Sequence, residues 1–319
     1  MEERLLGRTG LRVSSLGLGT LTWSRDTDAD EAGLQLRDFV DAGGTLIDTA
    51  ASYADGAAEE LIGSLMGSVV PREDLVLCTK GGVRRTTDGG VLDGSRGALL
   101  TSLDQSLARL GTDHVDLWLV QSPDPRTPLA ETAGALRQAL SSGRARYVGL
   151  SNHPGWQTAR VATLLEPHEH LAAVEVEYSL LQRGVEREVV PAAADLGCGV
   201  MAWSPLGRGV LTGKYRRSVP ADSRAASAHL AGFVEPYLGR ESAPVVEALA
   251  TAADGLGVTA LEVALAWVLG RPQVACAIVG ARTARQLRPA LELDLELPGA
   301  ITAALDEVSA PALGYPERR

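Results

Sequence analysis

Cysteine is scarce in this sequence, with three residues among 319. Cys78, Cys198 and Cys276 are isolated, odd in number and set among apolar neighbours, which indicates reduced core thiols in a cytoplasmic protein. His168 and His170 form the one close histidine pair, and no cluster of carboxylates or cysteines supports them. No metal site is therefore predicted.

Long apolar runs and an excess of positive charge are also missing. No uninterrupted apolar stretch reaches the length that spans a bilayer, and the first residues show neither an apolar run nor a cleavage-site pattern. The net charge is −10 and no basic patch is visible, so nucleic acid and acidic membrane surfaces are poor candidates as partners. A hydrophobic content of 45% is enough to bury a large core.

The chain lacks an internal linker and an early Gly-x-Gly-x-x-Gly turn. What it has is an alternation of short β-rich runs with longer helical patterns. Strands are predicted at residues 16–18, 46–47, 75–78, 115–120, 145–150, 172–176, 199–203 and 275–279. Helices are predicted at residues 30–42, 57–70, 98–110, 129–142, 155–165, 185–196, 243–255, 261–269 and 284–291.

Eight strand–helix alternations predict an α/β fold, a (β/α)8 TIM barrel formed by a single domain over residues 1–319. A doubly wound open sheet is the alternative, and it lacks its dinucleotide-binding fingerprint. Residues 5–13 predict an N-terminal β-hairpin that plugs the barrel bottom. Residues 215–240, after the seventh strand, are too polar for a core element and predict a lid or a disordered loop.

Ionisable side chains follow two of the early strands. Asp48 and Tyr53 come after the second strand, and Lys80 comes after the third. A tyrosine titrates near pH 10, and a neighbouring ammonium can bring its pKa down to a useful range for proton transfer. Active sites of barrel enzymes lie at the carboxyl ends of the strands, where Gln121, Ser151–Asn152 and Ser204 also fall.

In combination these motifs resemble the aldo-keto reductase family, from the hairpin to about Leu291. The matching segments are Asp48-Thr-Ala-x-x-Tyr53 with Gly56, Glu59 and Gly63; Thr79-Lys80; Gly149-Leu-Ser151-Asn152; Glu177-Tyr178-Ser179-Leu180; Trp203-Ser204-Pro205-Leu206-Gly207-Arg208-Gly209; and Val279-Gly280-Ala281-Arg282-Thr283. The resemblance implies a barrel that binds NADPH, with Tyr53 as proton donor, Lys80 lowering the Tyr53 pKa and Asp48 paired with Lys80. Together with Gln121 these are the expected catalytic residues.

The resemblance also implies a set of cofactor contacts. Ser151 and Asn152 would hold the nicotinamide carboxamide, and Trp203 would stack on the ring. Ser204 to Lys214 offers backbone N–H groups and two cations to a pyrophosphate, while Arg282 stands before a helix where a 2′-phosphate would meet it. The expected cofactor-binding residues are Thr20, Asp48, Ser151, Asn152, Glu175, Trp203, Ser204, Pro205, Leu206, Arg208, Lys214, Gly280, Arg282, Thr283 and Gln286.

Three positions depart from the family pattern. Gln121 stands in place of the active-site histidine, Glu175 in place of the glutamine that contacts the carboxamide, and Ala290 in place of an asparagine that often contacts adenine. The leading hypothesis is NADPH-dependent reduction of a small-molecule aldehyde or ketone to an alcohol. The alternatives are reduction of a conjugated C=C bond or another specialised step on a natural-product or sugar intermediate, and an NADPH-binding regulatory subunit with slow turnover. Substrate-pocket walls are expected from Trp23, Trp118, Gln121, Ser122 and residues 215–237.

Overall fold

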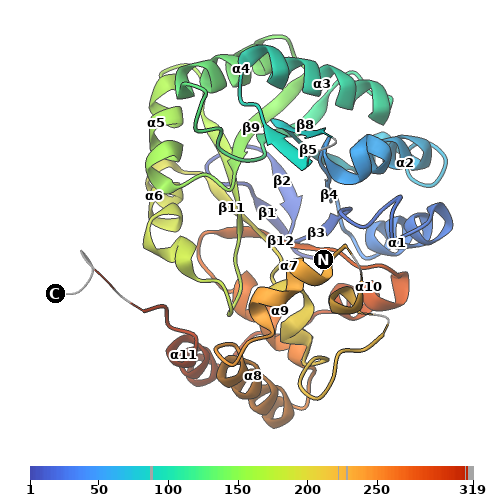
Figure 1. Cartoon of the computed structure of the whole chain (residues 1–319), viewed down its shortest axis with the longest axis vertical. Helices are drawn as coiled ribbons and strands as arrows, with labels where there is room; N and C mark the ends of the chain where they lie inside the picture. Colours follow the sequence, from blue (N-terminus) through green and yellow to red (C-terminus); the bar gives the residue numbers. More distant parts are fainter. Residues whose placement is uncertain (87–88, 222, 228, 313, 315–319) are drawn as a thin grey trace.

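A closed barrel of eight parallel strands forms the centre of the protein in a computed structural model that describes residues 1–86, 89–221, 223–227, 229–312 and 314 (Figure 1). The barrel confirms the fold class predicted from the sequence. Its strands are β3 (Leu16–Gly19), β4 (Leu46–Asp48), β5 (Val76–Gly81), β8 (Val115–Val120), β9 (Ala145–Ser151), β10 (Leu171–Glu177), β11 (Gly199–Trp203) and β12 (Val274–Val279). The sheet closes where β12 pairs with β3.

Helices surround the barrel, as Figure 1 shows. The helices that follow successive strands are α1 (Ala29–Asp41), α2 (Ala57–Leu65), α3 (Arg96–Leu110), α4 (Leu129–Ser141), α5 (Gly155–Leu165), α6 (Val189–Leu196), α9 (Ala260–Leu269) and α10 (Ala284–Leu291). Helices α7 (Ala231–Val234), α8 (Ala243–Leu256) and α11 (Gly299–Val308) are additions. Because helices cover the outer face and side chains fill the inside, strands such as β12 are buried along their whole length and read as continuous apolar runs.

The N-terminal hairpin closes the bottom of the barrel, as predicted. It consists of β1 (Glu3–Leu5) and β2 (Arg12–Ser14), paired antiparallel. Leu6 and Val13 are fully buried and belong to the same cluster as the inward-facing side chains of the barrel strands. Arg4 ties the hairpin to the barrel by donating to the carbonyl oxygens of Leu269 at 2.8 Å and Val274 at 3.1 Å.

Several predicted elements have different bounds in the structure. The helix predicted over residues 57–70 ends at Leu65, because Met66 is extended and Gly67 has a φ of 77°. The helix predicted over 185–196 is a short 3-10 turn, Gly184–Arg187, followed by α6. Strand β5 continues to Gly81, past the predicted end at residue 78.

Two elements were not predicted. A second hairpin, formed by β6 (Val83–Thr86) and β7 (Gly89–Leu92), follows β5. Helix α11 packs against α8 and buries Leu305.

The described residues of the segment 215–240 form more secondary structure than the predicted loop. It contains 3-10 turns at Arg224–Ala226 and Glu235–Tyr237, with α7 between them. Leu230, Val234 and Tyr237 are buried, which corrects the view that this segment is too polar to join the core. Pro220, Ser223, Arg224 and Phe233 face the cavity described below, so the segment covers part of that cavity.

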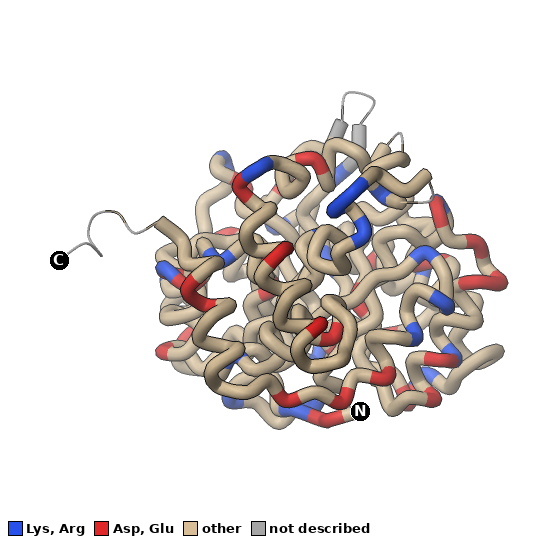
Figure 2. Tube along the Cα trace, turned by 90° about the horizontal axis from the view of Figure 1, so that it is seen from below, with Lys and Arg blue, Asp and Glu red and all other residues tan. Residues whose placement is uncertain are grey.

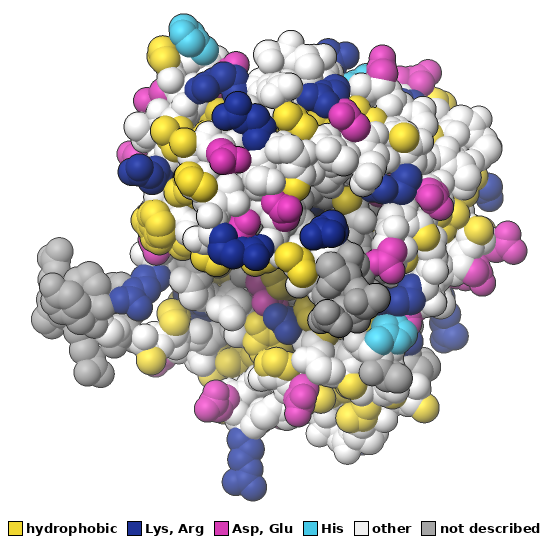
Figure 3. Space-filling view, turned by 45° about the horizontal axis from the view of Figure 1, so that its top comes forward, with side chains coloured by type: hydrophobic (Ala, Val, Ile, Leu, Met, Phe, Trp, Pro, Cys, Tyr) yellow, Lys and Arg dark blue, Asp and Glu magenta, His cyan; other side chains and the backbone are white. Residues whose placement is uncertain are grey.

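The surface carries charges of both signs. Acidic and basic residues are interspersed along the helices in Figure 2, and charged side chains lie among hydrophobic ones on the face shown in Figure 3. In the described part of the chain, no single helix is long and apolar enough to cross a membrane. Helices α8 and α9 meet that test only as a pair, and the pair is bent by 101°.

We expect the close approach of Gly7, in the N-terminal hairpin, to Gly197 to be important for stability. Gly7 has a φ of 62°, and a Cβ on it would lie 2.3 Å from the carbonyl oxygen of Gly197. Gly7→Ala should therefore lower the free energy of unfolding by roughly 2 kcal/mol or more, measured by urea denaturation.

The matched control for this substitution is Gly97→Ala in α3. Apart from its chain neighbours and the backbone of its own helix, a methyl group on Gly97 would meet no described atom within 4 Å, and the φ of Gly97 lies outside the left-handed region. Its substitution should leave stability unchanged or raise it slightly, since alanine has the better helix propensity. Equal stability of the two variants would contradict the role given to Gly7.

Candidate active site

A cavity of about 630 Å³ opens at the carboxyl ends of the barrel strands. Asp48, Ser151, Trp203 and Val279, which end β4, β9, β11 and β12, all line it. The predicted site residues that the structure brings together around this cavity are Asp48, Tyr53, Lys80, Gln121, Ser151, Asn152, Glu175, Trp203, Ser204, Pro205, Leu206, Arg208, Lys214, Gly280, Arg282 and Gln286. The chain has only two lysines, Lys80 and Lys214, and both are in this set.

A buried ammonium held by two carboxylates lies at the base of the cavity. Lys80 Nζ donates to Asp48 Oδ1 at 2.5 Å and to the carbonyl oxygen of Thr49 at 3.0 Å. The same nitrogen lies 3.3 Å from Oε2 of Glu175. All three ionisable side chains are at most 3% exposed. Burial of a charge is costly unless it is paired, so these residues stabilise one another's position.

The charges in this cluster shift the pKa values of its members. Burial disfavours the ammonium of Lys80, but Asp48 and Glu175 outweigh burial and raise the Lys80 pKa well above its usual range. Burial and the neighbouring Asp48 raise the pKa of Glu175 to about 8, against the opposing effect of Lys80. The raised pKa of Lys80 keeps the ammonium charged near neutral pH, and the raised pKa of Glu175 favours the protonated form of its carboxyl group.

Tyr53 lies beside Lys80, whose Nζ is 5.3 Å from the centre of the phenol ring. Burial raises the pKa of Tyr53 above its usual value, while the charge and hydrogen bond of Lys80 lower it. The sequence predicted a net lowering by Lys80. Lys80 acts in that direction, but desolvation and the two carboxylates outweigh it, so Tyr53 is a neutral phenol that retains its proton.

The loop that carries Tyr53 has a strained backbone and is followed by a buried hydrogen-bond network around Glu59. Ala54 and Asp55 have φ values of 47° and 56°, in the left-handed region that costs energy for residues other than glycine. Fully buried Glu59 accepts from Thr79 Oγ1 at 2.5 Å and from Arg109 Nε at 2.7 Å. Since Thr79 precedes Lys80 on β5, this network joins the loop of Tyr53 to the strand of Lys80.

Gln121 lies on the cavity wall directly after β8. Its Oε1 accepts from Ser52 Oγ at 2.9 Å, and its backbone oxygen accepts from Asn152 Nδ2 at 2.9 Å. An amide whose oxygen is already bonded has its NH2 group available as a donor. Gln121 is thus held by Ser52, which precedes Tyr53, and by Asn152, which the resemblance assigns to the carboxamide.

Asn152 connects the two sides of the cavity mouth. It accepts from Trp203 Nε1 at 3.0 Å and donates to Ser151 Oγ at 3.0 Å. Its φ of 59° turns the chain sharply after β9, which asparagine tolerates better than most residues. Behind it, His153 is buried and bonded to the oxygen of Ser151 at 2.8 Å, and burial lowers the His153 pKa to about 4.

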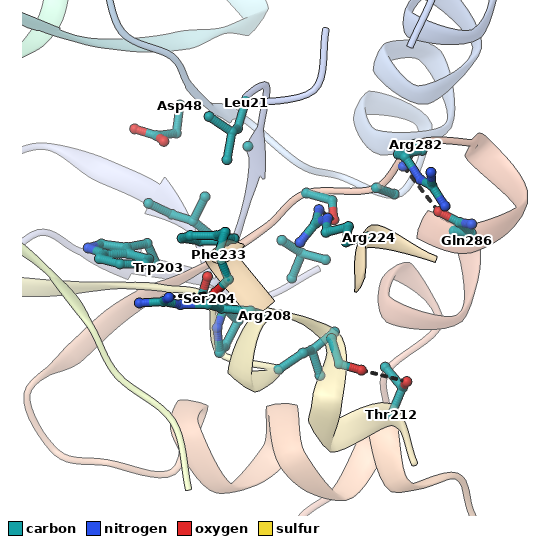
Figure 4. A pocket seen from close by; sticks show the side chains of 18 of the residues that line it. Leu21, Asp48, Trp203, Ser204, Arg208, Thr212, Arg224, Phe233, Arg282 and Gln286 are labelled. Atoms are coloured by element: carbon teal, nitrogen blue, oxygen red, sulfur yellow. Dashed lines mark hydrogen bonds between the residues drawn. The ribbon is translucent and has the colours of Figure 1, made fainter. Parts of the chain in front are cut away.

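Arg208 is engaged differently from the prediction. Its guanidinium donates to both oxygens of Glu177, at 2.7 and 2.6 Å, and to the carbonyl oxygen of Phe233 at 2.6 Å. It also lies 4.1 Å from the ring centre of Phe233, which in turn stacks on Trp203 with the ring centres 6.4 Å apart. Arg208 therefore connects α7 to the cavity wall (Figure 4), while it also lines the cavity.

The other end of the cavity is basic. Lys214, Arg224 and Arg282 line it, and Figure 4 shows Arg224 and Arg282 near the start of α10. Burial and the like charge of Arg282 lower the pKa of Arg224. Two guanidinium groups that repel each other in a cavity suit an anion, which would pair with both.

Some expected residues do not reach the cavity. Thr20 is buried with its hydroxyl donating to the carbonyl oxygen of Asp48, and Thr283 caps α10 by accepting from the backbone of Gln286. Neither is among the described residues that line the cavity. Trp23 and Trp118 are fully buried in the core and likewise form no part of the described lining, which corrects their assignment to the substrate pocket.

One group of potential metal ligands occurs among the described residues. The ligand atoms of Asp48, Cys78 and Glu175 lie within 4.8 Å of one another. The ammonium of Lys80 already bridges both carboxylates, and burial raises the Cys78 thiol pKa well above its usual range. A protonated thiol is a poor metal ligand, so this cluster is a set of hydrogen-bonding and ion-pair groups around Lys80.

Arg224 and Phe233 are cavity residues that the sequence analysis did not name individually, although it expected residues 215–237 to form walls of the pocket. Arg224 and Phe233 both belong to the segment 215–240 and line the cavity. An arginine in a long loop after the seventh strand was a usable signal for Arg224. Phe233 gave none, because its place depends on how α7 folds back against Arg208 and Trp203.

Comparisons with known proteins agree with this geometry. Residues 15–310 match the model of the aldo/keto reductase family. An uncharacterized oxidoreductase of Bacillus subtilis is 36% identical, covering 97% of this chain and 96% of its own length. A probable voltage-gated potassium channel subunit beta of Oryza sativa is 34% identical over 100% and 98%, and an L-glyceraldehyde 3-phosphate reductase of Escherichia coli K12 is 34% identical over 90% and 86%.

The protein belongs to the aldo/keto reductase family and is an oxidoreductase of the (β/α)8 barrel type. The family generally uses NAD(P)H as its cofactor.

Proposed function

We propose that the protein is an NADPH-dependent reductase that converts a small aldehyde or ketone to an alcohol, with Tyr53 as the proton donor. The observation that carries this proposal is the phenol ring of Tyr53, whose centre lies 5.3 Å from the buried Lys80 Nζ, which Asp48 holds at 2.5 Å. The name of the Escherichia coli relative, a reductase of an aldehyde, agrees with a carbonyl substrate.

The residues present fit a nicotinamide dinucleotide. Oε2 of Glu175 is buried, lies 3.3 Å from Lys80 Nζ and receives no hydrogen bond from the described residues, so it keeps the capacity to accept from a donor such as the carboxamide NH2. Ser151 and Asn152 stand at the same end, and the basic end suits phosphates. When bound, the cofactor supplies the hydride that is added to the carbonyl carbon.

The side chains of this protein then manage the carbonyl oxygen. The NH2 of Gln121 donates to that oxygen and orients it, and Tyr53 transfers its phenolic proton to it as negative charge develops. The tyrosinate that remains is stabilised by the ammonium of Lys80. Asp48 keeps Lys80 charged and in place, since it holds Nζ at 2.5 Å.

The two alternative functions depend on particular residues. Reduction of a conjugated C=C bond is favoured by Gln121 in the place of histidine, because glutamine offers the carbonyl oxygen a hydrogen bond without a second titrating group. A regulatory role accords with the name of the Oryza sativa relative. Retention of Asp48, Tyr53 and Lys80 around one buried ion pair favours turnover over regulation.

The first prediction from the proposed function concerns the proton donor. Tyr53→Phe keeps the ring but removes the proton, so carbonyl reduction should fall by roughly 10²- to 10⁴-fold while NADPH binding persists. Lys80→Met should act similarly through loss of tyrosinate stabilisation. Steady-state NADPH oxidation with a panel of aldehydes and ketones, together with fluorescence titration of NADPH, measures both effects. Near-normal turnover by Tyr53→Phe would mean that another group donates the proton.

The second prediction concerns cofactor choice. If Arg282 binds the 2′-phosphate, Arg282→Ala should weaken NADPH binding by roughly 10- to 100-fold, the usual loss for one charge-assisted contact. NADH binding should stay nearly the same, and titration of both cofactors measures the difference. Arg285→Ala, which removes a guanidinium group at the second residue of α10, is the matched control. Equal losses for NADPH and NADH would refute the assignment.

The third prediction concerns Gln121. Gln121→His restores a side chain that both donates and titrates, so it should raise turnover on simple aldehydes and add a transition to the pH–rate profile between about 6 and 7. Product analysis with an enone tests the C=C alternative in parallel. If Gln121→His and Gln121→Ala both leave carbonyl reduction unchanged, the side chain does not contact the substrate. If histidine abolishes activity on the best substrate, the specialised-substrate hypothesis gains.

A further inference from the structure

Glu175 is a buried acid that lines a cavity already containing an ion pair, and its Oε2 lies 3.3 Å from the ammonium of that pair. It is 2% exposed, lines the cavity, and its Oε2 receives no hydrogen bond from the described residues. One ammonium, Lys80, faces two carboxyl groups, Asp48 at 2.5 Å and Glu175 at 3.3 Å. If both carboxyls were ionised, the cluster would carry a net negative charge in a dry environment, which is unfavourable.

Five ionisable groups face Glu175 from the neighbouring strands and loop. The ionisable groups that face it are Asp48 from β4, Lys80 and Cys78 from β5, Tyr53 from the loop after β4, and Cys276 from β12. The pKa values of Lys80, Tyr53 and both thiols are raised above their usual ranges. Glu177, two residues further on the same strand, is bound to Arg208.

Glu175 lies at the end of the cavity that the proposed function assigns to the nicotinamide. In the parallel pair of β9 and β10 it lies opposite Ser151, and Asn152 donates its backbone N–H to the Glu175 carbonyl oxygen at 2.9 Å. Ser151 and Asn152 are the residues that the proposed function assigns to the carboxamide. The nicotinamide ring is neutral in the reduced cofactor and carries one positive charge in the oxidised cofactor. Of the two forms, only the oxidised ring offers a carboxylate a countercharge.

We propose that Glu175 couples the oxidation state of the bound cofactor to proton binding. Its carboxyl group stays protonated beside the neutral reduced ring and releases its proton when the positively charged oxidised ring binds. A glutamine in this place forms the same carboxamide contact but has no proton to release, so this coupling is a property of the glutamate. The inference rests on the proposed function, because it requires a nicotinamide cofactor in this cavity.

Binding of the oxidised cofactor should become tighter as pH rises, because it is linked to the release of a proton from Glu175. Burial and Asp48 raise the pKa of Glu175 to about 8, so the free protein holds the proton below that pH. A positive ring lowers the pKa of Glu175 in the complex, so binding of the oxidised cofactor releases a proton and becomes tighter as pH rises towards 8. Binding of the reduced cofactor lacks this dependence. The preference for NADP⁺ over NADPH should therefore increase with pH.

The test is the ratio of the NADPH and NADP⁺ dissociation constants, measured by fluorescence titration between pH 6.5 and 8.5. The 2′-phosphate is present in both forms, so its own titration cancels in the ratio. We expect the preference for NADP⁺ to rise by roughly tenfold over this range. Calorimetry at pH 7 in buffers of different ionisation enthalpy should show close to one more proton released with NADP⁺ than with NADPH.

Glu175→Gln is the decisive variant. It should bind both forms, with a ratio that no longer changes with pH and no difference in proton release. Glu60→Gln, the same chemical change at an exposed position on α2, is the matched control and should behave as the unmodified protein. Circular dichroism and thermal unfolding verify that each variant is folded.

The outcomes are distinguishable from those of the proposed function. Tight binding of both forms with a pH-independent ratio in the unmodified protein overturns the inference alone, whatever Glu175→Gln does. Persistence of the pH dependence in folded Glu175→Gln also overturns it, since the proton then resides on another group. Failure of both cofactor forms to bind overturns the proposed function and the inference together.

Discussion

The rest of the site depends on the ion pair between Lys80 and Asp48. Both side chains of this pair are at most 3% exposed. A buried ammonium needs a close counterion, and Asp48 provides it at 2.5 Å from the end of the neighbouring strand. That pair fixes where a positive charge stands relative to Tyr53. It also determines how Glu175 titrates, because a second carboxyl beside an already neutralised ammonium keeps its proton more easily.

The barrel makes this arrangement possible by ending its parallel strands on one rim. Asp48 ends β4 and Lys80 is the penultimate residue of β5, so residues 32 positions apart in the chain become neighbours. The hairpin at the other end supplies Leu6 and Val13 to the barrel interior. Well-packed interiors hold side chains in place, so the network of Glu59, Thr79 and Arg109 can hold the strained loop of Tyr53 in position.

The segment after β11 shows where sequence reasoning reached its limit. Its composition predicted a lid or a disordered loop too polar for the core, yet Val234 is fully buried and Phe233 stacks on Trp203. Arg208, expected to bind phosphate because of its Gly-rich surroundings, is bound to Glu177 and to the backbone of α7. Such pairings join residues 25 to 31 positions apart, and no local pattern in the sequence encodes which partner an arginine will find.

The sequence by itself determined the barrel, the order of its strands and the identity of the reactive groups, because apolar runs report burial and strand ends place Asp48, Lys80, Gln121 and Ser151 on one rim. It also showed that Glu175 and Gln121 depart from the family pattern. Only the tertiary structure decided how these groups ionise. The pKa values of Tyr53 and Glu175 are raised by desolvation and by charges contributed from other strands. Desolvation and charge–charge energies depend on distances in three dimensions, and the sequence does not contain those distances.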